Sequence, residues 1–352
     1  MIEFEEVKQV SAATWDQWLE ATGRARFYHS SGWLRFLDAT QPGRTLRARI
    51  LENGRPIGYF AGRLLSKYGL RILGSPLHGW TTHYMGPVLN ADCAFSAEAF
   101  LAMHRWVFGE LGCAHFELLT PDLPPGTAKD LSYEDQGFQS FLLDLRPGET
   151  DLFGRFNKGC KWSIHKAQRE GVRVEEARDE GFVDDYYRQL EDVFAKQRLV
   201  PTYARARVEA LWRCAPRDRL LCLRALRDDG ACIATAIVTY DRRCAYLWGA
   251  ASWRQEQKRC PNELLQWEAM KRLKQLGVPA YDFGGGGEYK AKYRGTRIHV
   301  PWYSRSRYRF LARLRDVYRD AFYGRQRLKG WLGGLKTGQD RREITAGAVG
   351  GS

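Results

Sequence analysis

Long apolar runs are missing from this chain of 352 residues, and none approaches the ~18 residues that a membrane-spanning helix requires. The N-terminal stretch, residues 1–6, is acidic and lacks the basic start and apolar core of a signal peptide. We therefore expect a cytoplasmic protein.

Cysteine and histidine are present without the spacings that would give them a chemical role. The 8 cysteines are scattered with no Cys-x-x-Cys pair, and the 7 histidines show no paired metal-ligand spacing. No Gly-x-Ser-x-Gly elbow occurs either. We expect reduced thiols and no bound metal, and both a metal hydrolase and a serine hydrolase are disfavoured.

Aromatic residues and positive charge are abundant instead. With 12 Trp, 17 Tyr and 17 Phe the chain is globular, and its length suggests roughly two domains. The net charge is +14, and most of it lies in two segments. Residues 155–173 hold 6 Lys/Arg against Glu170, and residues 305–336 hold 10 against Asp316 and Asp320. Such localised charge indicates an anionic partner: nucleic acid, a phosphorylated substrate or an anionic membrane.

The stretch 261–295 organises the chain. Pro261 opens an apolar segment that ends at Leu276 and Gly277, which predicts a helix. A short buried strand, residues 281–283, then runs into four glycines and two lysines. Glycines directly after a strand let backbone approach a ligand or another segment, because no Cβ intervenes. We interpret this loop as a site.

Two α/β halves are the economical explanation of the remaining pattern. Asn53-Gly54 and Asp229-Gly230 each mark a turn entering an apolar strand, and each is followed by a helix, a Leu-Gly pair and another strand. We predict mixed sheets flanked by helices, with one domain over 1–150, closed by a strand over 139–145, and a second over 151–325. Residues 326–352 are expected to form a basic, disordered tail.

Two further segments are candidates for binding. Residues 155–171 predict a basic linking helix that has Lys158, Lys161 and Arg169 on one face and apolar residues on the other. Residues 74–87 form an irregular stretch of a kind common in binding loops. It is rich in large rings: His78, Trp80, His83 and Tyr84.

Three ordered motifs resemble those of one family, the tandem-GNAT acyltransferases. They are the basic helix, the Pro261-Asn262 helix start, and the strand with its glycine loop and lysines. The family includes Fem-type peptidoglycan aminoacyltransferases and a related acetyltransferase branch found in polysaccharide or cell-envelope gene clusters. The resemblance covers about residues 27–325 and implies two acetyltransferase-like domains, in agreement with the duplication.

The family's implied chemistry is acyl transfer to an amine. Its implied co-substrate is acyl-CoA or aminoacyl-tRNA, neither held as a tightly bound cofactor. Two departures bear on the donor: the long paired-helix arm of several Fem enzymes is missing, and residues 254–262 replace the glycine-rich pyrophosphate turn of simple GNAT enzymes. The first favours acyl-CoA and the second aminoacyl-tRNA. A non-catalytic binder of nucleic acid or anionic lipid is the rival from another class.

From this chemistry we assign expected roles. Lys290 or Lys292 stabilises the oxyanion or the substrate's charge, and Asp282 or Glu288 orients or deprotonates the amine. The donor's phosphates are expected at a helix start. This start comprises Arg254, Lys258, Arg259, Asn262 and Glu263. The basic helix would contact a phosphorylated acceptor or a tRNA. The substrate-binding residues are expected to be a larger set: Lys158, Lys161, Arg169, Trp80, Tyr84, Gly284, Gly285 and Tyr289. Residues 305–336 are a candidate for contact with the inner membrane, although we favour packing on the protein.

Overall fold

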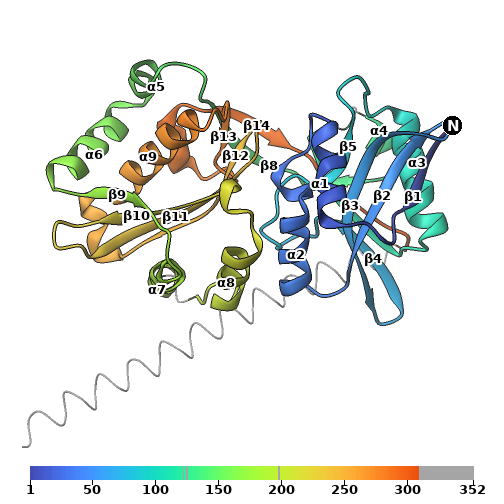
Figure 1. The fold of residues 1–352 in the computed structure, drawn as a ribbon, viewed down its shortest axis with the longest axis horizontal. Helices are drawn as coiled ribbons and strands as arrows, with labels where there is room; N and C mark the ends of the chain where they lie inside the picture. Colours follow the sequence, from blue (N-terminus) through green and yellow to red (C-terminus); the bar gives the residue numbers. More distant parts are fainter. Residues whose placement is uncertain (122, 124–125, 197–198, 309–352) are drawn as a thin grey trace, which may run out of the picture.

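The computed structural model describes residues 1–121, 123, 126–196 and 199–308. The expected tail, residues 326–352, and nearly all of the basic segment 305–336 lie outside these residues. Two mixed sheets with flanking helices make up two lobes (Figure 1), which confirms the predicted α/β class. No helix among the described residues combines the length and apolar character needed to span a bilayer.

The first lobe is built on an eight-stranded sheet. Seven strands follow in spatial order: β1 (Ile2–Glu6), β2 (Arg44–Glu52), β3 (Arg55–Lys67), β4 (Leu70–Ser75), β6 (His115–Leu119), β15 (Trp302–Ser306) and β7 (Glu134–Asp135), with β5 (Gly86–Leu89) paired to β3. Its helical elements are α1 (Ala12–Ala21), the 3-10 turn η1 (Phe27–His29), α2 (Ser31–Thr40), α3 (Ala97–Arg105), the π-helical turn η2 (Trp106–Glu110) and α4 (Thr127–Asp130). Ser11, Ser30 and Ser96 cap α1, α2 and α3 through their hydroxyls.

The second lobe has a seven-stranded sheet. Its spatial order is β14 (Thr296–Val300), β8 (Phe138–Asp144), β13 (Ala280–Asp282), β12 (Ala245–Ser252), β11 (Cys232–Tyr240), β10 (Leu220–Leu226) and β9 (Arg173–Glu176). Its helical elements are α5 (Glu149–Arg155), α6 (Lys158–Arg169), α7 (Gly181–Ala195), α8 (Arg205–Cys214), η3 (Arg217–Arg219), η4 (Arg254–Arg259), α9 (Pro261–Gln275) and η5 (Glu288–Tyr293). In Figure 1, α5, α6 and α9 lie on one side of this sheet, and α7 and α8 on the other.

The helix predicted from Pro261 forms as α9, with Leu265, Ala269 and Leu273 fully buried. Leu276 was expected on the same face but is 43% exposed, because the helix ends at Gln275. The basic helix is likewise amphipathic: Cys160, Ile164 and Ala167 are buried while Lys158 and Arg169 are exposed.

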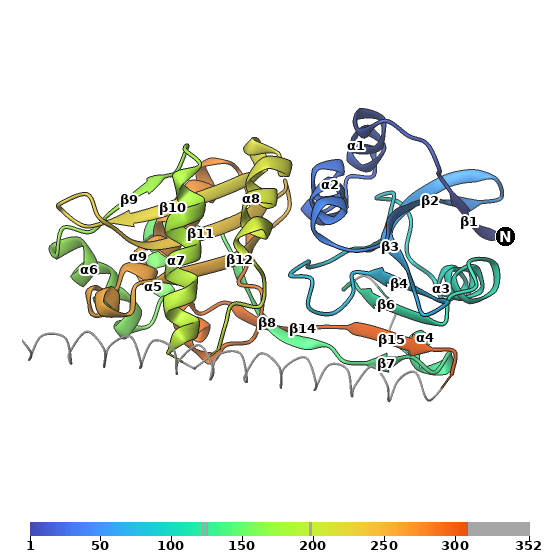
Figure 2. The same ribbon diagram turned by 90° about the horizontal axis from the view of Figure 1, so that it is seen from below.

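The two lobes exchange strands, which corrects the expectation that the strand over 139–145 closes the first half. This strand, β8, pairs with β13 and β14 of the second sheet, where it places Phe141 and Leu143 in the core beneath α9. Reciprocally, β15 pairs with β6 of the first sheet. Figure 2 shows this crossing ribbon between the lobes. The division into sheets therefore differs from the proposed boundary at residue 150.

A shared apolar core joins the lobes. It contains Trp15, Trp33 and Phe36 from the first lobe and Phe182, Leu211 and Tyr246 from the second. Helices α2 and α8 pack against each other in this region. The lobes are therefore held together by aromatic packing as well as by the crossing strands.

Candidate functional site

The carboxylate of Asp282 lies at the junction of the two lobes. Asp282 ends β13 and is 1% exposed, and it accepts a hydrogen bond from Tyr84 Oη. It also accepts from Ser140 Oγ at 2.5 Å and from the Gly284 amide at 2.8 Å. Ser140 Oγ in turn accepts from the Gly285 amide at 3.0 Å. One carboxylate thus fixes β8, the glycine turn and a loop from the first lobe.

That loop, residues 76–85, belongs to the ring-rich segment identified in the sequence. Tyr84 is buried, and both burial and the Asp282 carboxylate raise the pKa of Tyr84, so it stays protonated and donates. The Trp80 carbonyl accepts a hydrogen bond from Arg207 of α8, which ties the loop to the second lobe. The structure therefore brings Tyr84 to the predicted site, while Trp80 packs at the edge of the shared core.

The glycines at the end of β13 are required by close approach. Gly284 has φ +65°, and a Cβ there would lie 2.8 Å from Leu247 O and 2.9 Å from His83 Nε2. Gly285 has φ +130°, a conformation that side chains rarely adopt. This confirms the sequence-based expectation that backbone comes close to another segment here.

The two predicted lysines have different surroundings. Lys290 is 7% exposed, and its Nζ donates to the carbonyls of Phe283 at 2.7 Å and Gly285 at 3.2 Å. Burial lowers the pKa of Lys290, and the nearby Asp282 opposes that shift. Lys292 Nζ instead pairs with Glu263 Oε1 at 2.5 Å, at the first turn of α9.

The structure separates the remaining residues of this stretch from Asp282. Glu288 is exposed and pairs with Arg297 at 2.6 Å. Tyr289 is 67% exposed, and its ring lies 5.6 Å from Lys290 Nζ and 5.9 Å from Lys292 Nζ. Glu288 therefore lies at the surface, whereas Tyr289 stands next to both lysines.

Most of the residues expected to hold donor phosphates already have protein partners. Arg254 donates to Asp192 at 2.8 Å, and Arg259 pairs with both Glu170 and Glu256. Asn262 donates to Ser252 Oγ at 3.0 Å. Lys258 is exposed and has no carboxylate partner among the described residues. Judged on the part of the chain that the structure describes, Lys258 is therefore the cation at this helix start that is free to meet a ligand.

The strands beside the site diverge. Parallel β12 and β13 pair only at Ala245 with Tyr281 and Tyr246 with Asp282. Beyond Tyr246, β12 continues to Ser252 without a β13 partner and carries a bulge opposite Ile237 and Val238. The strand therefore leads from Asp282 directly to η4 and the start of α9.

The basic helix α6 begins close to the lysines. The Asn157 amide donates to the Lys292 carbonyl at 3.0 Å, and Asn157 also caps α6. Lys161 donates to the Gly154 carbonyl at 3.2 Å, whereas Lys158 and Arg169 point to solvent. Trp162, not predicted as a site residue, is 56% exposed on this helix.

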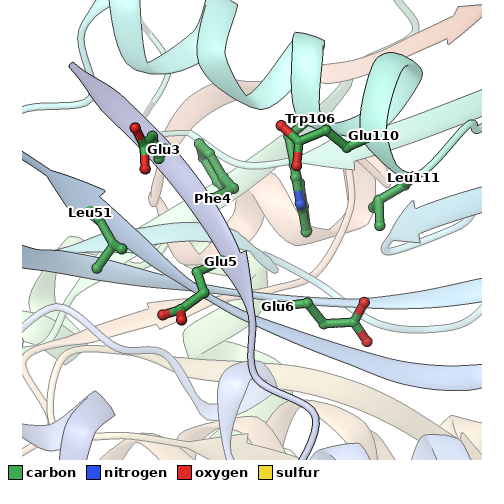
Figure 3. Close-up of a pocket in the computed structure, with 8 residues that line it drawn as sticks. All are labelled: Glu3, Phe4, Glu5, Glu6, Leu51, Trp106, Glu110 and Leu111. Atoms are coloured by element: carbon green, nitrogen blue, oxygen red, sulfur yellow. The ribbon is translucent and has the colours of Figure 1, made fainter. Parts of the chain in front are cut away.

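A surface hollow of about 520 Å³ lies elsewhere, between β1 and η2 (Figure 3). Four carboxylates surround it: Glu3, Glu5, Glu6 and Glu110. Such a rim repels anions, and none of the predicted site residues lines the hollow. It is therefore unsuited to a phosphate-bearing donor.

Ser140 and His83 are site residues that the sequence reasoning missed. His83 Nδ1 lies 2.8 Å from Tyr28 Oη, and the His83 ring stacks 6.2 Å from that of Tyr246. His83 stood in the ring-rich loop, which was the available signal. Nothing in the sequence connects Ser140 to Asp282, because their pairing depends on the strand exchange.

Comparison with known proteins agrees with this architecture. Residues 155–293 match the profile of the acetyltransferase (GNAT) domain family Acetyltransf_6. A search of curated protein sequences gave no match.

Solved structures match nearly the whole chain. The crystal structure of FemX has a TM-score of 0.69 at 12% identity, covering 88% of this chain and 99% of FemX. A tandem GNAT protein from the clavulanic acid biosynthesis pathway has 0.51 at 14%, covering 87% and 98%. L-PGS from Bacillus licheniformis has 0.53 at 13%, covering 90% and 97%.

The protein therefore has the tandem-GNAT fold that the sequence motifs suggested, with a GNAT domain in its second lobe.

Proposed function

We propose that the protein transfers an acyl group from acyl-CoA to an amine of a cell-envelope, polysaccharide or small-molecule acceptor. The observation that carries this proposal is that β12 and β13 pair over only two residues. An open edge of β12 therefore runs from the turn that holds Asp282 and Lys290 to the start of α9. A thioester carbonyl lying along the edge of β12 that β13 leaves unpaired would meet backbone donors. The phosphates of the CoA would then reach the N-terminus of a helix.

The roles of the site residues follow from their contacts. Asp282 holds the glycine turn and Tyr84 in place, so we assign it to positioning. Lys290 is anchored to the same turn, and we assign it to stabilising the charge that develops on the acyl oxygen. Lys292 reaches the first turn of α9, where it contributes positive charge next to the donor. Lys258 would contact the donor's phosphates.

Helix packing supports acyl-CoA over aminoacyl-tRNA as the donor. Helices α7 and α8, the segment where a paired-helix arm would be expected, pack on the sheet and in the shared core. Aminoacyl-tRNA remains the second candidate, favoured by the exposed Lys158, Arg169 and Trp162 of α6. Both donors belong to the cytoplasm, where we place the protein.

Ligand-dependent thermal stability tests the donor. Purified protein is melted with acetyl-CoA, with a longer acyl-CoA and with charged tRNA, because a ligand at ~100 times its Kd adds roughly 2.7 kcal/mol. We expect a rise in Tm with CoA thioesters that Lys258→Glu reduces and that Lys158→Glu leaves unchanged. A shift with charged tRNA alone, lost in Lys158→Glu, would replace acyl-CoA by aminoacyl-tRNA. No shift with any donor would contradict the proposal.

A further inference from the structure

His83 occupies a distinctive position for a residue of the first lobe. Its Nδ1 meets Tyr28 Oη at 2.8 Å, while its Nε2 faces the glycine turn, 2.9 Å from where a Cβ on Gly284 would lie. The same turn carries the carbonyl that holds Lys290. An imidazole nitrogen and an ammonium group therefore meet at one turn, and they come from different lobes.

Nothing in the described part of the chain forms a hydrogen bond with His83 Nε2. On the other side of the ring, Tyr28 Oη also lies 3.1 Å from Thr239 Oγ1, and Thr239 is fully buried. A phenol has one proton, so if Tyr28 gives it to Thr239, His83 must donate from Nδ1. Nε2 then carries a lone pair.

The opposite tautomer is disfavoured. It would leave an Nε2–H facing Gly284 with no acceptor, and orphaned N–H donors are rarer in proteins than orphaned acceptors. The hydrogen bonds from His83 through Tyr28 to Thr239 are therefore compatible with the tautomer that places a basic nitrogen toward the glycine turn, and the unpartnered Nε2 favours it.

The charged and titratable groups that face His83 come from several elements. They are Tyr28 from η1, Tyr84 from the same loop, Tyr246 from β12, Asp282 from β13 and Lys290 from η5. Burial lowers the pKa of His83, and Lys290 lowers it further, while Asp282 acts in the opposite direction. The tyrosine pKa values are raised by burial, so these rings stay neutral. His83 is therefore neutral at pH 7.

The two carboxylates that the sequence offered as bases are less suited to that role. Asp282 already accepts from Tyr84, Ser140 and the Gly284 amide. Glu288 lies in an exposed ion pair with Arg297. A base needs a free lone pair within reach of the proton it removes.

We propose that His83 is the catalytic base that accepts the proton of the attacking amine. This inference rests on the proposed acyl transfer. The amine nitrogen attacks the thioester carbonyl carbon, a C–N bond forms, and the N–H proton passes to His83 Nε2. The C–S bond then breaks, and the imidazolium returns that proton to the departing thiolate, giving amide and free CoA.

The test compares His83→Gln with His78→Gln, a matched change in the same loop. His78 lies at the exposed start of the loop, where its ring contacts Trp302, outside the Asp282 cluster. Release of CoA from acetyl-CoA is measured with a panel of primary amines over about pH 5 to about pH 9. Melting curves verify that both variants fold.

We expect the wild-type kcat/KM to rise with pH through a midpoint below about 6.5, because only neutral His83 can accept the proton. His83→Gln should lose about 100-fold or more and also lose this acid limb. His78→Gln should keep both. Tyr28→Phe, which removes the hydroxyl that orients the ring, should keep the limb but move its midpoint.

Imidazole NMR of the folded protein gives an answer independent of turnover. We expect a lone pair on His83 Nε2 at neutral pH, and a proton on that nitrogen would overturn the inference. A folded His83→Gln that retains the acid limb would overturn it as well. A wild-type protein that acylates none of the amines would instead contradict the proposed acyl transfer, whichever nitrogen of His83 carries the proton.

Discussion

Each lobe has a buried carboxylate on the strand at the same position in its sheet. Among the described residues, only the carboxylate of the second lobe lies where the neighbouring parallel strand continues without a partner on that side. Glu117 on β6 and Asp282 on β13 are 6% and 1% exposed, and each strand pairs with one strand in parallel and with an exchanged strand on the other side. Glu117 bonds His115 at 3.1 Å and accepts from the His78 amide at 2.7 Å.

The pairing of the parallel strands distinguishes the two lobes. β4 and β6 pair over four residues, from Ile72 with His115 to Ser75 with Leu118. β12 and β13 pair over two, and β12 then continues to Ser252 paired, among the described strands, with β11 only. In the first lobe the parallel strands therefore stay paired at the position where those of the second lobe separate. The first lobe instead contributes Tyr84 and His83 to the site of the second lobe. The site belongs to both lobes, although the family profile covers residues 155–293 alone.

The largest expected contrast comes from neutralising each carboxylate. Asp282→Asn should lower the rate of acyl transfer by about 100-fold, because it displaces the glycine turn and Tyr84 from their working geometry. Glu117→Gln should leave the rate within about threefold, since its partners, His115 on β6 and the His78 amide, lie outside the Asp282 cluster. CoA release and urea unfolding are measured for both.

Both variants should lose stability, by about 1–3 kcal/mol, because each weakens a hydrogen-bonded buried carboxylate. The comparison fails if Glu117→Gln, at an unchanged fold, loses as much activity as Asp282→Asn. That result would place chemistry in the first lobe too.

A second contrast concerns two lysines that form ion pairs with glutamates of α9, Lys292 of η5 and Lys271 of α9 itself. Lys292→Ala should reduce turnover about 10- to 100-fold through loss of positive charge beside the donor. The free energy of unfolding should change by about 1 kcal/mol or less, because the Lys292–Glu263 pair is partly exposed. Lys271→Ala is the matched control: it breaks the 2.8 Å pair with Glu268 on the same helix, outside the site. Equal activity of the two variants would remove Lys292 from the mechanism.

The sequence was sufficient for the local parts of this site. The glycine run, Pro261 and the helical spacing of apolar residues predicted α9, β13 and the turn that follows, because these features depend on neighbouring residues. The duplication predicted two similar lobes. The contact between Tyr84 and Asp282 could not be predicted from the sequence, because the two residues are 198 positions apart in the chain.

The strand exchange was also hidden from local reasoning. The sequence of β8 does not indicate which sheet the strand joins, and what assigns it to the second sheet is pairing with β13 and β14. Ser140, which β8 carries to Asp282, was missed for the same reason. The sequence also suggested free phosphate-binding cations at Arg254 and Arg259, whose carboxylate partners come from α7 and from the end of α6.

Glycine substitutions test the close approach at the open strand end. Gly284→Ala and Gly277→Ala both place a side chain at positive φ, +65° and +74°, and each should cost about 1 kcal/mol or more from backbone strain. Gly284→Ala should cost about 1–3 kcal/mol beyond that, because its Cβ meets Leu247 O, whereas the space at Gly277 is open. Urea unfolding measures both, and equal losses would show that the turn can relax.

The smallest expected effect is a pH dependence in the first lobe. His104 lies between Tyr133 and Arg305 of the exchanged strand β15, and burial together with Arg305 lowers the pKa of His104 to about 4. The unfolded chain binds the His104 proton more readily than the folded chain does. The stability of the folded state is therefore greatest above the ordinary histidine pKa of about 6.5, and it declines as the pH falls toward about 4. His104→Gln should flatten the decline of Tm across that range. A decline that is unchanged in the variant would mean that other groups, and not the histidine that contacts β15, set the acid sensitivity of this lobe.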